Sequence, residues 1–210
     1  MPWPRHHKKQ TRARIVAAAA AALRANGISG VSVADIMDQV GLTHGGFYSH
    51  FASKERLLGA AVKQAGGETI EALSKTVRSL PVDRRIHAVI DNYLSIEHAE
   101  HPERGCPLAA LGPELARVEG KVRQGFTRAV EERIDWFRNL LPGDPTAREN
   151  AVGTVACLVG GLILARVVGG GRQSDNVLAA TRRFLHRALE HGVAEAGSRR
   201  RARNRRGDGN

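Results

Sequence analysis

The sequence predicts an all-helical protein, and three observations lead to that fold class. Hydrophobic residues make up 42% of the 210 residues, which is enough to build a packed core. Aromatic residues make up only 4%, so the core must consist mostly of alanine, leucine and valine. Prolines are scarce between about residues 8 and 80, and no segment sustains the alternation of apolar and polar residues typical of strands. We therefore expect an all-α chain of about nine helices.

The formal net charge of +11 is concentrated at the two ends of the chain. Residues 1–62 contain eight Lys or Arg against three Asp or Glu, and residues 197–210 contain six against one. The middle, 63–196, is almost neutral, with 18 against 17. Two basic regions that flank a neutral body favour a polyanionic partner, nucleic acid before an anionic membrane.

The cysteine pattern argues against a disulfide framework and against a zinc site. Cys106 and Cys157 lie far apart, and neither belongs to a pair with metal-ligand spacing. His98 and His101 are close in sequence near an expected helix end, but no third ligand accompanies them. We therefore expect no metal, no cofactor and a reducing, cytoplasmic environment.

The first helix is expected over 8–26, after an irregular arm formed by residues 1–7. Asn26 and Gly27 are typical of a helix end. Ser32, followed by Asp35 three positions later, is typical of a capped helix start. The helix that Ser32 opens has apolar residues at helical spacing and ends at Gly41; these residues are Val33, Ile36, Met37 and Val40.

A second short helix follows at once, with Thr43 as its N-cap. Leu42 and Phe47 have the spacing of a hydrophobic staple, which fixes the angle at which a chain enters a helix. Phe47 and Phe51, four positions apart, predict its buried face. Two short helices joined by a tight glycine turn indicate a helix-turn-helix. Ser53 then caps a helix over 54–80, with a bend expected near its paired glycines.

Five more helices are expected in the remainder, over 83–100, 105–118, 120–141, 147–168 and 174–192. Asp144 and Pro145 suggest the start of the fourth of these, and Ser174 suggests the start of the last. The apolar run 151–165 is shorter than a membrane span, so we expect it in a core or a subunit interface. Residues 196–210 are too polar to fold alone and are expected to be disordered.

The second helix of the helix-turn-helix carries two glycines, although each costs about 1 kcal/mol relative to alanine in a helix interior. With Phe47 and Phe51 buried, the surface from Thr43 to His50 must face outward, and it is polar and almost uncharged. Gly45 and Gly46 remove bulk from that surface. Poor helix-forming residues at an exposed position are typical of a functional surface that another molecule must approach closely.

The segment "TRARIVAAAAAALRANGISGVSVADIMDQVGLTHGGFYSHFASKERLL" resembles the DNA-binding domain of the TetR family of one-component transcriptional repressors. The resemblance covers about residues 10–58, where "NG", "GLT", "GGFYSHF" and "SKE" occur in the family's order and spacing. It implies a three-helix DNA-binding head and a larger helical body that binds a ligand and dimerises. The second helix of a helix-turn-helix enters the major groove, with its N-terminal residues nearest the base edges.

The resemblance assigns expected DNA contacts to particular residues. Thr43, His44, Gly45 and Gly46 would face the groove; Tyr48 and His50 would contact the sugar-phosphate backbone; Lys54 and Ser32 would hold phosphates. For Ser32 and Thr43 the alternative is a purely capping role, and both roles can coexist. The basic arm "RHHKKQTRAR" would follow phosphates or remain a solvated tail, and the arginine-rich end would add unspecific affinity.

An effector pocket is expected in the body, lined by large residues on its central helices. The candidates are Tyr93, His98, Cys106, Leu108, Leu111, Phe126, Trp136 and Phe137. For each of them the alternative is ordinary core packing. The segment "RGCPLAALGPELA" resembles a branch of the family in which some members sense oxidants through cysteine. Cys106 near Arg104 would then be a redox sensor, the alternative being a passive thiol.

Together these expectations divide the chain into an arm (1–7), a DNA-binding domain (8–58), an effector-binding and dimerisation domain (59–195) and a basic tail (196–210). The partners would be a pseudo-palindromic DNA operator, a second copy joined through 147–168 and 174–192, and a small apolar or amphipathic effector. The protein would be cytoplasmic, associated with the nucleoid, and not bound to membranes. Two alternatives are an architectural DNA binder and an enzyme, but no catalytic constellation supports the enzyme.

Overall fold

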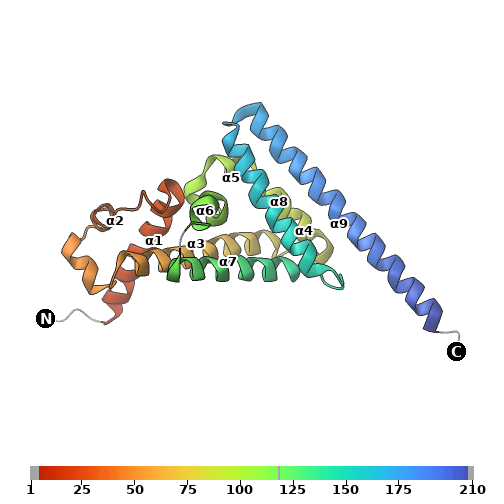
Figure 1. Cartoon of the computed structure of the whole chain (residues 1–210), viewed down its shortest axis with the longest axis horizontal. Coiled ribbons are helices and arrows are strands. Elements are labelled where there is room, and N and C mark those ends of the chain that lie inside the picture. Colours follow the sequence, from red (N-terminus) through yellow and green to blue (C-terminus); the bar gives the residue numbers. More distant parts are fainter. Residues whose placement is uncertain (1–4, 118, 208–210) are drawn as a thin grey trace. The chain divides into compact units, whose positions relative to one another are not determined.

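The computed structural model describes residues 5–117 and 119–207, and within them all regular secondary structure is helical, which confirms the predicted all-α class (Figure 1). The α-helices are α1 (Arg5–Asn26), α2 (Val33–Gln39), α3 (Lys54–Val77), α4 (Val82–Tyr93), α5 (Ile96–Glu100), α6 (Pro107–Leu115), α7 (Gly120–Arg138), α8 (Ala147–Val167) and α9 (Gly171–Gly207). Two short 3₁₀ helices are η1 (His44–Ser49) and η2 (Pro102–Arg104).

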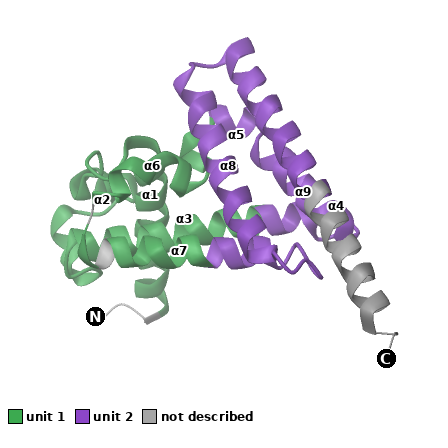
Figure 2. Cartoon of the chain, turned by 45° about the vertical axis from the view of Figure 1, so that its right-hand side comes forward, with its two compact units in different colours: residues 1–72, 101–131 green, residues 73–100, 132–210 purple. Residues whose placement is uncertain are grey.

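The chain forms two compact units, shown in green and purple in Figure 2. Unit 1 comprises residues 1–72 and 101–131, and unit 2 comprises 73–100 and 132–210. Unit 1 therefore includes more than the expected DNA-binding segment 8–58, because η2 and α6 pack on α1. The functional division at residue 58 stays a prediction.

Helix α1 is the centre of unit 1. Its alanine-rich inner face buries Ile15, Ala19 and Leu23 completely. The helix begins at Arg5, three residues before the expected start, because no glycine or proline interrupts the run after Arg5. Near its other end, Arg24 Nη1 lies 2.8 Å from Glu68 Oε2 on α3, and Arg24 Nε donates to the Glu103 carbonyl at 2.7 Å. Arg24 thereby ties α1 to α3 and η2.

The helix-turn-helix has the predicted order but a different second element. Ser32 caps α2 as expected, with its hydroxyl accepting from the Asp35 N–H at 3.3 Å. Gly41 makes the turn with φ of +71°, a conformation that favours glycine. The following six-residue segment is a 3₁₀ helix, consistent with its shortness and its two glycines. Thr43 occupies the N-cap position, but its side chain makes no capping hydrogen bond.

Helix α3 is continuous across Gly66 and Gly67, so the expected bend does not interrupt it, and it ends at Val77 instead of 80. A methyl group at Gly66 would lie 3.7 Å from the Ala129 side chain on α7, an ordinary packing distance. Ser53 accepts a hydrogen bond from the Arg56 N–H at 3.3 Å, which confirms it as the cap of this helix.

In unit 2 the expected single helix over 83–100 is two helices, α4 and α5. The break at Leu94 and Ser95 has a local cause. His98 Nδ1 bonds the Tyr93 carbonyl at 2.7 Å, and the Ser95 hydroxyl caps α5 by accepting from the His98 N–H at 3.2 Å. Arg182 on α9 donates to the Leu94 carbonyl. These partners satisfy backbone groups that would otherwise continue the helix.

Two further helix ends differ from the expected ones for similar local reasons, and the cap of a third helix differs. α6 begins at Pro107, with Cys106 at the N-cap, because proline fits the first helical position. α7 ends at Arg138, where the chain tightens into a turn that places the Leu141 N–H 3.0 Å from the Arg138 carbonyl. α8 begins at Ala147 as expected, but its N-cap is Thr146, because the Asp144 carboxylate bonds Thr146 and forms a turn instead of the expected cap. Residue 118, at the end of the expected 105–118 helix, lies outside the described residues.

Helices α8 and α9 form an antiparallel pair joined at Gly169–Gly171, three glycines that all have positive φ (Figure 1). By length and composition α8 could cross a membrane, but it packs along α9 and α5. α9 begins at Gly171, so Ser174 lies inside the helix, buried, instead of capping it. The helix extends to Gly207, beyond the expected end near residue 192. Side chains from 191 onward lie outside the described residues, and the expected disorder of 196–210 stays a prediction.

Candidate nucleic-acid interface

The helix-turn-helix in unit 1 presents one polar surface, built on a small apolar base. Phe47 and Phe51 are almost completely buried, and their rings stack with centroids 5.8 Å apart, which confirms their predicted role. Because these two rings anchor η1, the residues between and before them face outward. Thr43, His44 and Gly45 are exposed, and Tyr48 is 65% exposed.

The two glycines of η1 leave part of the exposed surface without side chains, as the sequence predicts. A methyl group added at Gly45 would meet no atom within 4 Å. At Gly46 it would lie 3.6 Å from Thr43 Oγ1 and 3.7 Å from Met37 Cε, both ordinary contacts. Neither glycine has positive φ. The fold of this chain therefore requires glycine at neither position.

Aromatic and hydroxyl side chains lie beside the two glycines. The Tyr48 ring contacts Phe47 edge-on at 5.2 Å between centroids and His44 at 6.2 Å. These contacts limit the positions of the Tyr48 ring while its hydroxyl end faces outward. The Ser49 hydroxyl donates to the Gly46 carbonyl at 2.7 Å, which satisfies a backbone group within the short helix. The surface is thus partly ordered before any partner arrives.

His50 is held differently from its neighbours. Burial lowers the pKa of its imidazole, and the charges of Lys8, Arg12 and His7 lower that pKa further, so the ring is neutral at physiological pH. Its Nδ1 is buried and has no hydrogen-bond partner. Only Nε2 is therefore left for the phosphate contact expected at this residue.

The charged side chains that lower the pKa of His50 lie on α1, so the start of α1 lies beside the end of η1. Arg12 lies over the Phe51 ring, with its guanidinium carbon 4.4 Å from the ring centroid. Arg14 Nη2 donates to the Val40 carbonyl at 2.8 Å and so fixes α1 to the end of α2. Lys8 and Lys9 remain exposed on the outer face. The basic segment expected to follow phosphates is thus an ordered part of α1 from residue 5 onward.

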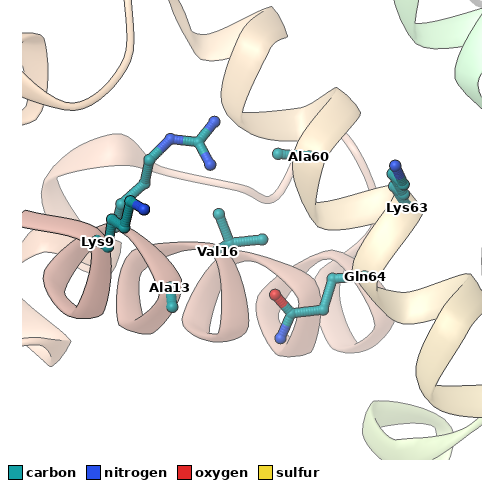
Figure 3. A pocket seen from close by; sticks show the side chains of 7 residues that line it. Lys9, Ala13, Val16, Ala60, Lys63 and Gln64 are labelled. Carbon is teal, nitrogen blue, oxygen red and sulfur yellow. The ribbon is translucent and has the colours of Figure 1, made fainter. Parts of the chain in front are cut away.

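A basic cleft of about 640 Å³ lies between α1 and α3 in unit 1. Figure 3 shows Lys9 and Lys63 at its two sides, with Val16 and Ala60 between them. Arg12 and Gln64 also line it. With Lys54 at the first turn of α3, these side chains add to the positive charge that the sequence places in residues 1–62.

The expected effector-pocket residues fall into both units and are buried or half-buried. Cys106, Leu108, Leu111 and Phe126 lie in unit 1, and Tyr93, His98, Trp136 and Phe137 lie in unit 2. Within unit 2 the Tyr93 and His98 rings meet edge-on at 4.6 Å, and Trp136 Nε1 donates to the Ser74 hydroxyl at 3.2 Å. The structure brings together only these small groups, and a shared pocket stays a prediction.

Cys106 is completely buried at the N-cap of α6. Arg104, expected to activate its thiol, is largely exposed and lies 3.6 Å from the Glu103 carboxylate. A buried thiol reacts slowly with oxidants in solution, so this arrangement argues against redox sensing. In the part of the chain that the structure describes, no three His, Cys, Asp or Glu side chains form a group that could hold a metal ion.

Sequence analysis missed one charged residue of unit 2. Arg133 on α7 is 2% exposed, and its Nε and Nη1 atoms are buried without a hydrogen-bond partner. A signal was present: Arg133 follows Phe126 by seven positions and precedes Phe137 by four, so it falls on the buried face of a regular helix.

Comparison with known proteins identifies the family of this helix-turn-helix. Residues 15–61 match the family model described as "Bacterial regulatory proteins, tetR family". An uncharacterised HTH-type transcriptional regulator of Mycobacterium tuberculosis is 28% identical over 166 residues, which cover 74% of this chain and 84% of the relative. The transcriptional repressor DhaR of Mycobacterium sp. strain GP1 is 27% identical over 117 residues, 55% of this chain and 57% of DhaR.

Two solved structures have a fold similar to that of this chain over most of its length. A TetR transcriptional regulator from Chloroflexus aurantiacus is 27% identical and has a TM-score of 0.71, covering 86% of this chain and 96% of its own. A TetR-family regulator from Agrobacterium tumefaciens, 23% identical with a TM-score of 0.71, covers 86% of this chain and 98% of its own and shows the same fold. The chain is therefore a member of the TetR family of bacterial regulatory proteins, a transcriptional regulator with a DNA-binding role.

Proposed function

We propose that the protein is a homodimeric repressor that binds a pseudo-palindromic DNA operator and is released by a small molecule. The single observation that carries the DNA-binding part is the bare surface of η1. Gly45 faces open space and needs no special backbone conformation, so its missing side chain has no cause within the protomer. Close approach of a DNA groove supplies that cause, because the second helix of a helix-turn-helix enters the major groove.

The proposed contacts follow from exposure and charge. Thr43 and His44 would face base edges; their side chains are exposed, and Thr43 makes no capping bond that would occupy it. Tyr48 would donate its hydroxyl to a phosphate. Lys54, at the start of α3, would bind a phosphate together with the unpaired N–H groups of that helix terminus. No arginine lies in η1, so bidentate readout of guanine from this helix is not expected.

Dimerisation is supported by apolar side chains that α8 and α9 leave exposed within one protomer. Leu164 and Val167 on α8 and Phe184 on α9 are each more than half exposed. Val152 at the other end of α8 is also exposed. An exposed apolar face on two long packed helices is typical of a subunit interface. A second copy would bury this face and present a second η1 to the next major groove.

Release by a ligand is supported by family membership and by the helical body that accompanies the DNA-binding segment. A ligand that binds better to the conformation with misplaced η1 helices would shift the population away from DNA. The name of DhaR, a repressor, supports repression as the direction of control. Regulators of this family are cytoplasmic proteins, and we propose the same location for this chain.

The DNA-binding part is tested with a matched pair of glycine variants. An operator is first obtained by selecting bound sequences from a random pool. Gly45→Leu should then weaken operator binding at least about tenfold, or about 1.4 kcal/mol, because the new side chain prevents close approach. Gly67→Leu, also in open space but on α3, should bind normally. Unchanged operator affinity in Gly45→Leu would show that η1 does not face the groove.

The dimer is tested separately by charge insertion into the apolar face. Phe184→Glu should give a monomer in analytical ultracentrifugation and a loss of operator binding, with helical content retained. Val82→Glu, which alters another exposed apolar residue, on α4, should remain dimeric. If Phe184→Glu stays dimeric, the interface lies elsewhere.

A further inference from the structure

Arg133 has no counter-charge among the residues that the structure describes. The residue lies in the part of α7 that belongs to unit 2 (Figure 2), and it is 2% exposed. Its Nε and Nη1 atoms are buried without hydrogen-bond partners. Among the side chains that the structure describes, no carboxylate lies within ion-pair distance of it. Since an arginine side chain does not lose its proton in proteins, a full positive charge is enclosed there.

Other arginines with restricted exposure are all satisfied. Arg24 in unit 1 pairs with Glu68 and donates to the Glu103 carbonyl. Arg166 in unit 2 donates to the carbonyl oxygens of His98 and Ala99, at 2.8 and 3.1 Å. An enclosed charge without partners is strongly unfavourable, and native proteins contain few such groups. Arg133 therefore differs from these arginines, and a partner from outside the chain would have to supply its missing hydrogen-bond acceptors.

His98, which lies near Arg133, supplies no counter-charge. His98 lies close enough for the Arg133 charge to act on its imidazole. Burial, with the charges of Arg166 and Arg133, lowers the pKa of His98 to about 4, although its bond to the Tyr93 carbonyl acts in the opposite direction. His98 is therefore neutral at physiological pH. Arg166 is a second cation near His98, but its guanidinium donates to two carbonyls, whereas Nε and Nη1 of Arg133 have no acceptor.

The buried residues near Arg133 on α7 are apolar. Ile134 and Phe137 are buried, and Phe137, one turn after Arg133, is completely enclosed. Tyr93, whose ring contacts His98, is also enclosed. A ligand here would meet one cation within largely apolar surroundings. A carboxylate would supply acceptors for the unpaired guanidinium N–H groups, and an apolar body would suit the enclosed side chains around them.

We propose that Arg133 anchors the effector site of unit 2 and that it selects a monocarboxylate carried on an apolar body. The carboxylate oxygens would supply the missing hydrogen-bond acceptors and cancel the enclosed charge. This inference rests on the proposed function, since it names the chemical class of the effector. It also explains why a residue that destabilises the empty protein is present on a buried helix face.

The test measures ligand binding by the full chain directly, using calorimetry and thermal unfolding. The probes are straight-chain carboxylates from acetate to dodecanoate, with benzoate and phenylacetate, each paired with its neutral primary amide. At least one carboxylate should bind and raise Tm by several degrees, while its amide binds at least about tenfold more weakly. If no carboxylate binds, or if the amides bind equally well, the proposal is wrong.

Variants then assign the binding to Arg133. Arg133→Met should abolish the carboxylate response and leave Tm unchanged or higher, because it removes an unpaired charge without changing side-chain length greatly. Arg133→Lys should retain part of the response. Arg128→Met, an exposed arginine on the same helix, should respond like the wild type. A large fall in Tm for Arg133→Met would instead identify Arg133 as a structural residue and overturn the proposal.

Operator binding separates this inference from the proposed function. The active carboxylate should weaken operator affinity at least about tenfold in the wild type and have no effect on Arg133→Met. If the ligand-free protein binds its operator but carboxylates neither bind nor release it, the effector class is wrong and the DNA-binding function stands. If carboxylates bind through Arg133 but no operator exists, the proposed function fails and the ligand site stands.

Discussion

At the scale of single residues, local spacing predicts what is buried, and three-dimensional partners decide what each polar group does. Phe47 and Phe51 are four positions apart in sequence, so their shared buried face could be read directly. Arg133 also lies on a buried helix face, but its lack of a partner depends on residues far away in sequence. The hydrogen bond from His98 to the Tyr93 carbonyl, which helps to end α4, is local, but apolar spacing does not reveal which backbone carbonyl a polar side chain will bind.

Ser32 offers a prediction that separates its two roles. Its hydroxyl accepts from the Asp35 N–H, so Ser32→Ala should lose about 1 kcal/mol of unfolding free energy. Ser32→Asp keeps a capping acceptor and should keep stability, but its negative charge would repel a nearby phosphate. We expect Ser32→Asp to weaken operator binding at least about tenfold in anisotropy titrations. If Ser32→Asp binds the operator with wild-type affinity, Ser32 acts only as a helix cap.

His98 predicts a loss of stability toward acid. Its pKa of about 4 in the folded protein lies below the ordinary value of 6.5, so below pH 6.5 the unfolded chain binds a proton that the folded protein excludes. Stability should therefore fall as pH decreases, by about 2 kcal/mol between about pH 7.5 and about pH 5. The lowered pKa of His87, caused first by burial and then by His186, acts in the same direction.

Denaturant unfolding at the two pH values, at equal protein concentration, measures this effect. His98→Gln keeps a side-chain N–H that can donate to the Tyr93 carbonyl but cannot titrate. This variant should therefore lose most of the His98 contribution and retain that of His87. An identical pH dependence in the wild type and His98→Gln would show that His98 is not the group responsible.

At the scale of elements, apolar periodicity predicted that helices exist, whereas hydrogen bonds to side chains decided where they stop. The α2, η1 and α3 starts follow Ser32, Thr43 and Ser53 as expected, because each cap lies beside the element it begins. The break between α4 and α5 was not predicted, because it depends on hydrogen bonds of His98 and Ser95 to the backbone and on Arg182 from α9, which binds the Leu94 carbonyl. Nor was the pairing of α6 with α1, which depends on the tertiary fold.

Gly161 tests how closely α8 and α9 must pack. A methyl group there would lie 2.7 Å from Thr181 Cγ2 and 2.9 Å from Thr181 Oγ1, closer than side-chain atoms can approach. Thr181 is branched, and its hydroxyl donates to the Val177 carbonyl at 2.8 Å, so it cannot easily move aside. Gly161→Ala should therefore lower the free energy of unfolding by about 1–3 kcal/mol.

The control for this variant lies on the same helix. A methyl group at Gly153 meets no atom within 4 Å, so Gly153→Ala should be neutral or stabilise α8 by up to about 1 kcal/mol. Chemical denaturation of both variants at one protein concentration compares them. Equal effects of the two substitutions would contradict close packing between the helices as the reason for glycine at position 161.

At the scale of the whole molecule, charge divides the chain more clearly than hydrophobicity does. Residues 1–64 carry the helix-turn-helix and the basic cleft of unit 1. The six arginines between 199 and 206 form a second basic segment, far from η1 in sequence. Two sources of DNA affinity are therefore possible in one protein: a shaped surface that reads sequence, and a basic segment that attracts any duplex.

Deleting residues 198–210 separates these two sources. If η1 provides recognition, the truncated protein should bind its operator within about threefold of the wild type at moderate salt, because base contacts and phosphate contacts of unit 1 remain. Its affinity for a scrambled duplex should fall by about tenfold at low salt, and that affinity should depend less steeply on salt, because fewer counterions are released. Anisotropy titrations of both duplexes at several salt concentrations measure both quantities. An architectural binder would behave in the opposite way. The deletion would remove most binding to every sequence, and the full-length protein would bind the operator no more tightly than the scrambled duplex.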